Sequence, residues 1–380
     1  MVKPAKATLN LKKKTSAKTK INFLGIMLYF LFYKIICYDT TMNENNNKDK
    51  DKIDFLAIGE IAIDAFIRLK DASVNCDINK ENCQICMAFG AKLPYESVTE
   101  IPAVANAGNA SVSASRLNLK SALVANIGDD KNGELCIESF KKDGVSTDFI
   151  TINKDKRTNY HYILWFEDER TILQKHSDFN YHFPNIGNPK WIYLTSLGEQ
   201  SLPYHAQMLE YLKNNEGVKI AFQPGIFQIK MGFEKLKDIY ARTEIFFCNI
   251  EEAKTILNIE NHNEVKNLLQ KVYALGPKIV VLTDGIKGSY SYDGAEFLFM
   301  PSYPDPKPPY ERTGAGDAFS STVVSAIILG KTLAEALAWG SINAMSVVQE
   351  IGAQKGLLTR EKLEEYLKNA PENYKARKIN

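Results

Sequence analysis

The sequence predicts an α/β protein in which a central, mostly parallel β-sheet is covered by helices on both faces. Three observations favour this fold class. Short apolar runs recur along the chain, and each stops at Gly, Pro or Asn. Segments with apolar residues at helical spacing stand between these runs. Strands and helices that alternate in this way form parallel sheets with helices on both faces.

The expected elements follow one another in order. Strands are expected at 53–60, 119–130, 190–198, 218–225, 243–249 and 277–285. Helices are expected at 106–117, 132–143, 261–276 and from residue 315 onward. Ligands of such sheets bind beyond the carboxyl ends of the strands. The polar residues that follow each apolar run are therefore the candidates for a site.

Two segments interrupt the alternation of strands and helices. Residues 67–103 are rich in Cys, Gly, Pro and charged residues. Residues 157–175, RTNYHYILWFEDERTILQK, alternate aromatic and polar side chains around a charged turn. This pattern is typical of a β-hairpin. A hairpin inserted into an α/β domain is a candidate lid, and we expect both segments to belong to it.

The overall composition excludes some classes of function. The 380 residues include 47 Lys and Arg against 45 Asp and Glu, a formal net charge of +2. This balance gives no electrostatic argument for a nucleic-acid partner. Six cysteines are too few for a disulfide scaffold and fit a reducing compartment, so a cytoplasmic location is expected.

The N-terminal residues differ in composition from the rest. Residues 1–41 combine a basic arm with the apolar run 21–38. The pattern predicts a signal anchor that would tether the chain to a membrane, a cleaved signal peptide, or a stretch upstream of a true start at Met42. A polar linker is expected at 42–52. The main domain is expected at 53–370 and a polar tail at 371–380.

A glycine-rich motif, TGAGD at 313–317, precedes the last long apolar stretch. Its glycines let backbone amides approach a ligand without a Cβ in the way. The following helix points its free N–H groups and its dipole at that ligand, as phosphoryl transfer requires. Asp317 is ionised at neutral pH and can accept a hydroxyl proton. A loop with an acidic helix cap would also explain the motif.

Two more motifs follow strands in the C-terminal half. The first motif, NIEEA, contains Asn249 and Glu252. Helix capping alone would explain both residues. The alternative is that they lie near the phosphates of a nucleotide and a water-shelled Mg²⁺. TDGIKGS, at 283–289, is either a hairpin turn or a backbone cover for the ribose and phosphates of a nucleotide.

Polar residues in the N-terminal half are candidates for binding a hydroxylated substrate. Asn109 lies at the start of a helix of small residues, for which tight helix packing is the simpler explanation. Glu60 and Asp64 lie just past the first strand, where a pair of acids can hold sugar hydroxyls. One acid alone would be expected at the surface.

Together these motifs resemble the PfkB/ribokinase family of sugar and nucleoside kinases. The family's order and approximate spacing are matched by GE…D, GN before a small-residue helix, NIGDDKNGE, NIEEA, TDGIKGS and TGAGDAF. The resemblance covers residues 53 to 367. It implies a three-layer, Rossmann-like domain of the ribokinase type with a small β lid. It also implies transfer of the γ-phosphate of ATP to a hydroxyl, with Mg-ATP as cofactor.

The resemblance also implies a role for each site residue. The implied residues are Asp317 as base with Gly314, Ala315 and Gly316 as anion hole; Asn249, Glu252, Thr283, Gly285, Gly288 and Asn343 at the nucleotide; and Glu60, Asp64, Gly108 and Asn109 at the substrate. Glu252 would hold Mg²⁺ through water. Lids of this family often pair, which implies a homodimer.

The chain departs from the family pattern at several positions. The loop 350–356 resembles one that helps hold a monovalent cation such as K⁺, but Glu311 replaces the usual aspartate and Arg312 a small residue. Val104 and Ala105 replace a Gly-Gly pair near the substrate, and AFQPG, at 221–225, stands where Asp and Asn are common. Dependence on K⁺ and the substrate class therefore stay open.

Cys76, Cys83 and Cys86 leave a separate question open. A Cys-x-x-Cys pair with a third cysteine nearby is compatible with bound zinc, with redox chemistry or with plain lid structure.

The function that the sequence favours is that of an ATP-dependent carbohydrate kinase. The alternatives are a nucleoside kinase of the same family and a non-catalytic member that binds a sugar or nucleotide. A nicotinamide enzyme is disfavoured, because no G-x-G-x-x-G follows the first strand.

Overall fold

The computed structural model describes residues 52–76, 83–167, 169–259 and 264–379. The expected extension at 1–41, with its apolar run 21–38, and residues 42–51 of the expected linker lie outside these ranges. The chain from Lys52 onward forms one compact unit. Within the described ranges, no helix has the length and apolar character needed to cross a bilayer.

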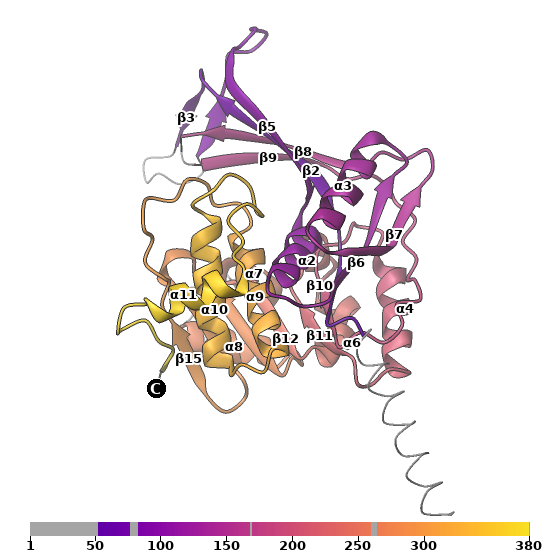
Figure 1. Cartoon of the computed structure of the whole chain (residues 1–380), viewed down its shortest axis with the longest axis vertical. Helices are drawn as coiled ribbons and strands as arrows, with labels where there is room; N and C mark the ends of the chain where they lie inside the picture. Colours follow the sequence, from indigo (N-terminus) through magenta and orange to yellow (C-terminus); the bar gives the residue numbers. More distant parts are fainter. Residues whose placement is uncertain (1–51, 77–82, 168, 260–263, 380) are drawn as a thin grey trace, which may run out of the picture. The chain divides into compact units, whose positions relative to one another are not determined.

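A ten-stranded, mostly parallel sheet forms the centre of this unit (Figure 1). In order across the sheet its strands are β16 (Arg377–Lys378), β15 (Phe297–Met300), β14 (Ser289–Tyr292), β13 (Ile279–Thr283), β12 (Ile245–Asn249), β11 (Lys219–Phe222), β10 (Trp191–Leu194), β1 (Phe55–Ile58), β6 (Ser121–Gly128) and β7 (Ser146–Asn153). The strands from β13 to β7 pair in parallel, whereas β14, β15 and β16 are antiparallel. The predicted α/β fold class is confirmed.

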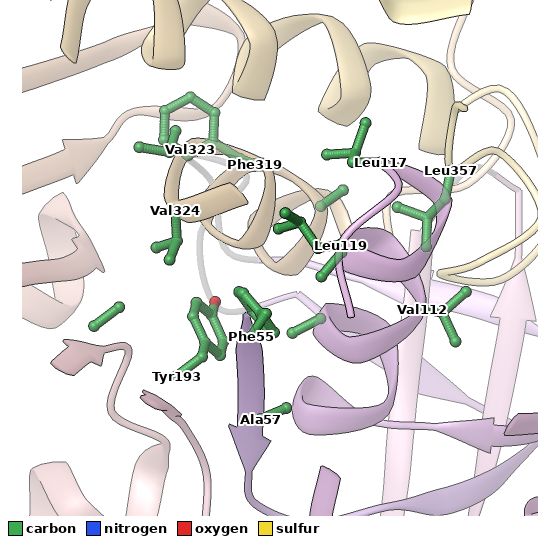
Figure 2. Close-up of a cluster of buried hydrophobic side chains, with 14 of the residues drawn as sticks. Phe55, Ala57, Val112, Leu117, Leu119, Tyr193, Phe319, Val323, Val324 and Leu357 are labelled. Carbon is green, nitrogen blue, oxygen red and sulfur yellow. The ribbon is translucent and has the colours of Figure 1, made fainter. Parts of the chain in front are cut away.

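Helices cover both faces of the sheet and bury alternate residues of its strands. Those on one face are α2 (Asn106–Arg116), α3 (Lys131–Lys142), α9 (Ala315–Ile328), α10 (Leu333–Val347) and α11 (Arg360–Lys368); those on the other are α4 (Leu202–Lys213), α6 (Phe233–Arg242), α7 (Ile250–Leu257) and α8 (Val265–Tyr273). Phe55 and Ala57 of β1 pack on the first face, as Figure 2 shows, and Leu56 and Ile58 pack on the second. Burial on both faces explains why the strand appears in the sequence as an unbroken apolar run.

A second, four-stranded sheet is inserted between elements of the large one. Its strands, in order, are β5 (Tyr95–Val104), β2 (Ala62–Leu69), β8 (Asn159–Phe166) and β9 (Glu169–Lys175). We call it the lid sheet; it lies at the top of Figure 1. The hairpin expected within 157–175 is present as β8 and β9. The lid sheet begins at residue 62, earlier than the expected 67, because β2 continues directly from the turn after β1.

The register of the lid sheet separates two faces. Asp64 pairs with His161, and His161 pairs with Gln174, so these three side chains share one face. Tyr162 and Leu173 are paired one position further along and therefore point to the opposite face. The first face borders a cavity described below, and the second exposes apolar side chains.

Two features outside the site bear on the sequence expectations. A disulfide joins Cys76 and Cys83 next to the hairpin of β3 (Ser73–Asn75) and β4 (Gln84–Cys86), so of the three alternatives left open for these cysteines, bound zinc does not fit. No cluster of metal-binding side chains is found among the residues that the structure describes. The expected polar tail is docked: β16 pairs with β15, and the buried Tyr374 Oη donates a hydrogen bond to the Ala338 carbonyl, 2.6 Å away.

Candidate active site

The TGAGD motif forms the loop and first turn that begin α9. Gly314 precedes the helix with φ of 80°, and a Cβ there would lie 2.2 Å from the Ala353 Cβ. Only glycine fits this position. A Cβ on Gly316 would meet nothing closer than the Gln223 side-chain nitrogen, 4.0 Å away, so the helix start faces open space. Asp317 follows in the first turn and is 7% exposed.

Three cavities surround this helix start. The outer cavity, about 450 Å³, lies between the 283–289 turn, the 302–312 segment and α10. The lid cavity, also about 450 Å³, lies between the lid sheet, the 223–227 segment and the start of α9. The small cavity, about 100 Å³, lies at the ends of β12 and β13. Gly316 borders all three, so the cavities converge on the first turn of α9.

Three side-chain amides hold the Asp317 carboxylate. The Asn106 and Asn109 amides donate to its two oxygens, each over 2.8 Å, and the Gln223 amide donates over 3.2 Å. Burial raises the pKa of Asp317, and the three donors act against this rise because they stabilise the ionised form. In its ionised form, a buried carboxylate that is open to a cavity can take a proton from a bound hydroxyl.

Sequence reasoning missed two of these three donors. Asn106 is the first residue of α2, and Gln223 directly follows β11. The Tyr193 hydroxyl donates to the Gln223 carbonyl oxygen and so directs the Gln223 amide toward Asp317. The rule that sites lie at the carboxyl ends of strands could have found Gln223. No comparable signal marked Asn106.

Two acid–histidine pairs line the lid cavity. Asp64 Oδ1 lies 3.1 Å from His161 Nδ1, and both side chains are buried. Glu60 Oε2 lies 3.0 Å from His176 Nδ1, and this carboxylate raises the pKa of His176. The Tyr181 hydroxyl donates to the other Glu60 oxygen over 3.3 Å. These groups alternate donors and acceptors, a surface suited to hydroxyl groups, and His176 was not anticipated from the sequence.

A buried carboxylate links the lid sheet to the loop before α9. Arg170 Nε, on β9, lies 3.6 Å from Glu311 Oε1, and Glu311 is 2% exposed. The two Glu311 oxygens also accept the backbone amides of Thr313 and Gly352. The charge of Glu311 is therefore balanced within the protein.

Asn249 and Glu252 form a reciprocal cap at the start of α7. The Asn249 side chain accepts the Glu252 amide, and the Glu252 carboxylate accepts the Asn249 amide, each over 2.8 Å. The helix-capping explanation is thus confirmed. Both residues also border the small cavity, and Glu252 borders the lid cavity as well. Burial raises the pKa of Glu252.

The 283–289 turn borders the outer cavity through Thr283, Gly285 and Gly288. Gly288 has φ of 111°, and a Cβ there would lie 2.2 Å from the Met300 carbonyl oxygen. This turn therefore requires glycine, and it keeps the backbone close to the cavity.

The structure brings most of the expected residues together and places two elsewhere. Those at the cavities are Glu60, Asp64, Asn109, Asn249, Glu252, Thr283, Gly285, Gly288, Gly314, Ala315, Gly316 and Asp317. Asn343 is fully buried between α9 and the 358 segment: its amide donates to Thr322 Oγ1 over 2.7 Å, and its oxygen accepts the Leu358 amide over 2.9 Å. Gly108 is buried in α2 against the Ala103 carbonyl and borders none of the three cavities.

Solved structures share this architecture. A nucleoside kinase of Methanocaldococcus jannaschii, an archaeal member of the ribokinase family, superposes with a TM-score of 0.69 at 19% identity, covering 84% of this chain and 99% of its own. A ribokinase of Arabidopsis thaliana, solved with ribose and ATP, gives a TM-score of 0.68 at 18% identity, covering 83% of this chain and 99% of its own. The described unit has the ribokinase fold.

Sequence comparison defines the family. The signature of the pfkB family carbohydrate kinases matches residues 106–360. An uncharacterized sugar kinase of Archaeoglobus fulgidus is 26% identical over 256 residues, which are 64% of this chain and 97% of the relative. The chain belongs to the pfkB family and is a carbohydrate kinase.

Proposed function

We propose that this kinase transfers the γ-phosphate of ATP to a hydroxyl group of a sugar, with Asp317 as the general base. One observation carries the proposal: the Asp317 carboxylate lies at the start of α9, where the outer cavity and the lid cavity meet. ATP in the outer cavity and an acceptor in the lid cavity would then have their reacting ends at the same helix terminus.

The residues around this junction match the needs of phosphoryl transfer. Asp317 accepts the proton of the attacking hydroxyl, and the amides at Gly314, Ala315 and Gly316 stabilise negative charge on the moving group. Thr283, Gly285 and Gly288 would lie along the nucleotide, since they border the outer cavity. Asn106, Asn109 and Gln223 favour the ionised form of the base and orient it.

The residues near Asp317 also fit a magnesium ion. Mg²⁺ retains most of its waters and is usually held by one or two carboxylates together with substrate phosphates. Glu252 provides one half-buried carboxylate beside the small cavity, next to the proposed path of the phosphates. Bound Mg²⁺ would offset the phosphate charge, and Glu252 would hold it through water.

The region around Glu311 fits a monovalent cation less well than the region around Glu252 fits Mg²⁺. The carboxylate expected to take part, Glu311, already accepts two backbone amides and pairs with Arg170. Because its charge is balanced by the guanidinium, we propose no role for K⁺ at this position.

The lid sheet is proposed to cover the acceptor. Asp64, His161, Arg170 and Gln174 line the lid cavity from its inner face. The acid–histidine pairs favour an acceptor rich in hydroxyl groups. A nucleoside is the second candidate, because Phe227 and Ile172 also line the cavity and provide an apolar surface for a base.

An assay of ADP formation tests the proposal. With Mg-ATP and a panel of sugars and nucleosides, we expect ADP to form with at least one acceptor, in equal amount to the phosphorylated product. Thermal-shift measurements on the same panel should detect binding, since a ligand at 100 times its Kd stabilises a protein by about 2.7 kcal/mol. Stabilisation without ADP would identify a non-catalytic binding protein instead.

The outer face of the lid sheet is proposed to pair with a second copy of the chain. Val98, Tyr162 and Leu173 are 45%, 49% and 51% exposed on this face. An open sheet face with several apolar side chains favours association. We expect light scattering to give twice the mass of one chain, and Leu173→Glu to lower it to one. A monomeric mass for the unaltered protein would contradict this proposal.

A further inference from the structure

Arg312 stands directly before the glycine motif, where it borders two cavities. It lines the outer cavity together with the 302–309 segment, and it lines the lid cavity together with Thr313 and Gly314. Among the described residues that line the outer cavity, it is the only Lys or Arg. The lid cavity has a second arginine, Arg170, which does not border the outer cavity. Arg312 is thus the cationic side chain common to both.

The charge of Arg312 is not matched by a close partner. Within the described part of the chain, no carboxylate lies within ion-pair distance of its guanidinium. Glu311, its neighbour, is bound by Arg170 and two backbone amides. Asp305 lies near enough for Arg312 to lower its pKa, although burial raises that pKa more. The exposed side chain of Arg312 is therefore available to a ligand.

We propose that Arg312 is a further catalytic residue, whose guanidinium binds the phosphoryl group as it passes from the outer cavity to the lid cavity. The inference rests on the proposed kinase function. In the transfer, the bond between the γ-phosphorus and the bridging oxygen of ADP breaks, and a bond to the acceptor oxygen forms. The acceptor proton goes to Asp317, and ADP leaves with the bonding electron pair.

A guanidinium at this junction suits the charge distribution of that step. Its planar fork can donate to two phosphoryl oxygens at once, which an ammonium group cannot do in a fixed geometry. The free backbone amides of the first turn of α9 lie at the same junction. Arginine in the equivalent electrostatic role accelerates other phosphoryl transfers by about 10³–10⁵-fold. Arg170 is held by Glu311 and is less suited to this role.

The test compares Arg312→Ala and Arg312→Lys with Arg360→Ala, which removes the same side chain from a surface pair with Glu364 on α11. Steady-state kinetics with Mg-ATP and the best acceptor of the panel should show that Arg312→Ala lowers kcat by about 10³-fold, the lower end of the range for such arginines. The acceptor KM should change by less than about threefold, which is under 0.7 kcal/mol. Arg312→Lys should recover part of kcat, and Arg360→Ala should match the unaltered protein.

Binding measurements test the role of Arg312 without requiring the kinase reaction that was proposed above. Calorimetry with a non-hydrolysable ATP analogue and with AMP should show weaker binding of the analogue alone in Arg312→Ala. If the unaltered protein forms no ADP with any acceptor, the proposed function fails, and this comparison still decides on Arg312. Unchanged kcat, equal loss for analogue and AMP, or a change confined to the acceptor KM would overturn the inference. The last result would indicate an anionic acceptor bound by Arg312.

Discussion

Replacing Asp317 by asparagine is expected to lower kcat by about 10²–10⁴-fold, the usual contribution of a general base, in a chain that still folds. Asparagine has nearly the same size but cannot take the acceptor proton. The Asp317 carboxylate accepts hydrogen bonds from three side-chain amides, those of Asn106, Asn109 and Gln223. The asparagine NH₂ group is itself a donor and would face one of these donors, so some loss of stability is expected. Removal of a buried charge partly offsets that loss, since burial disfavours the ionised form.

The measurement combines ADP formation with circular dichroism during heating. Asp238→Asn, on the exposed side of α6, provides the matched control, because it makes the same chemical change away from the cavities. A cooperative melt with little turnover supports the base assignment. Turnover near that of the unaltered protein would remove Asp317 from the mechanism.

The dependence of kcat/KM on pH is a second test of Asp317 as the general base. The base acts in its ionised form, so kcat/KM should fall as pH drops through the pKa of Asp317, which burial places above that of an ordinary carboxyl group. Asn109→Ala removes a donor to the ionised form, so this pKa should rise further. The acidic loss of activity should then begin at a higher pH in Asn109→Ala. A profile that does not move would indicate that another group titrates.

Gly316→Ala is expected to lower kcat/KM by about 10²-fold with little change in stability. The added methyl group meets no described atom within van der Waals distance, the nearest being a Gln223 nitrogen at 4.0 Å. It enters the junction of the three cavities instead, where a displacement of the reactants by about 1 Å has an effect of this size. Because Gly316 is helical, the free energy of unfolding should change by less than about 1 kcal/mol.

Two other glycines give the comparison its controls. Gly314→Ala should destabilise the fold by about 2 kcal/mol or more, because φ is positive and the methyl group would overlap Ala353. Gly217→Ala introduces a methyl group into open space outside the three cavities. It should change neither kcat/KM nor the free energy of unfolding. If Gly316→Ala keeps full activity, the phosphoryl group does not pass over the first turn of α9.

Sequence reasoning reached the residues whose positions depend on short-range structure. The glycines at 314 and 288 are required by backbone conformation within a few residues, and Asn249 and Glu252 cap the helix that contains them. Such features leave a local pattern in the sequence. The apolar runs were equally informative, since strands buried on both faces must be apolar throughout.

The rest of the site depends on how distant elements are oriented. Asn106 and Asp317 are 211 residues apart, and they meet because α2 and α9 pack together on the same face of the sheet. Asn343 shows the effect of helix phase: it points toward α9, whereas Ser341, Ala344 and Met345 on the same helix border the outer cavity. Neither relation can be derived from spacing along one segment.

Helix α9 is part of the hydrophobic core and also begins at the proposed active site. Its residues from Asp317 to Ala326 are all buried, and it packs against both α2 and α10. A substitution that tilts this helix would disturb packing and reactivity together. The hairpin of β8 and β9 also has buried side chains, Ile163 and Trp165, but its residues His161, Arg170 and Gln174 border the lid cavity and not the outer cavity. Evolution toward new acceptors can therefore proceed there while the phosphate-handling helix stays fixed.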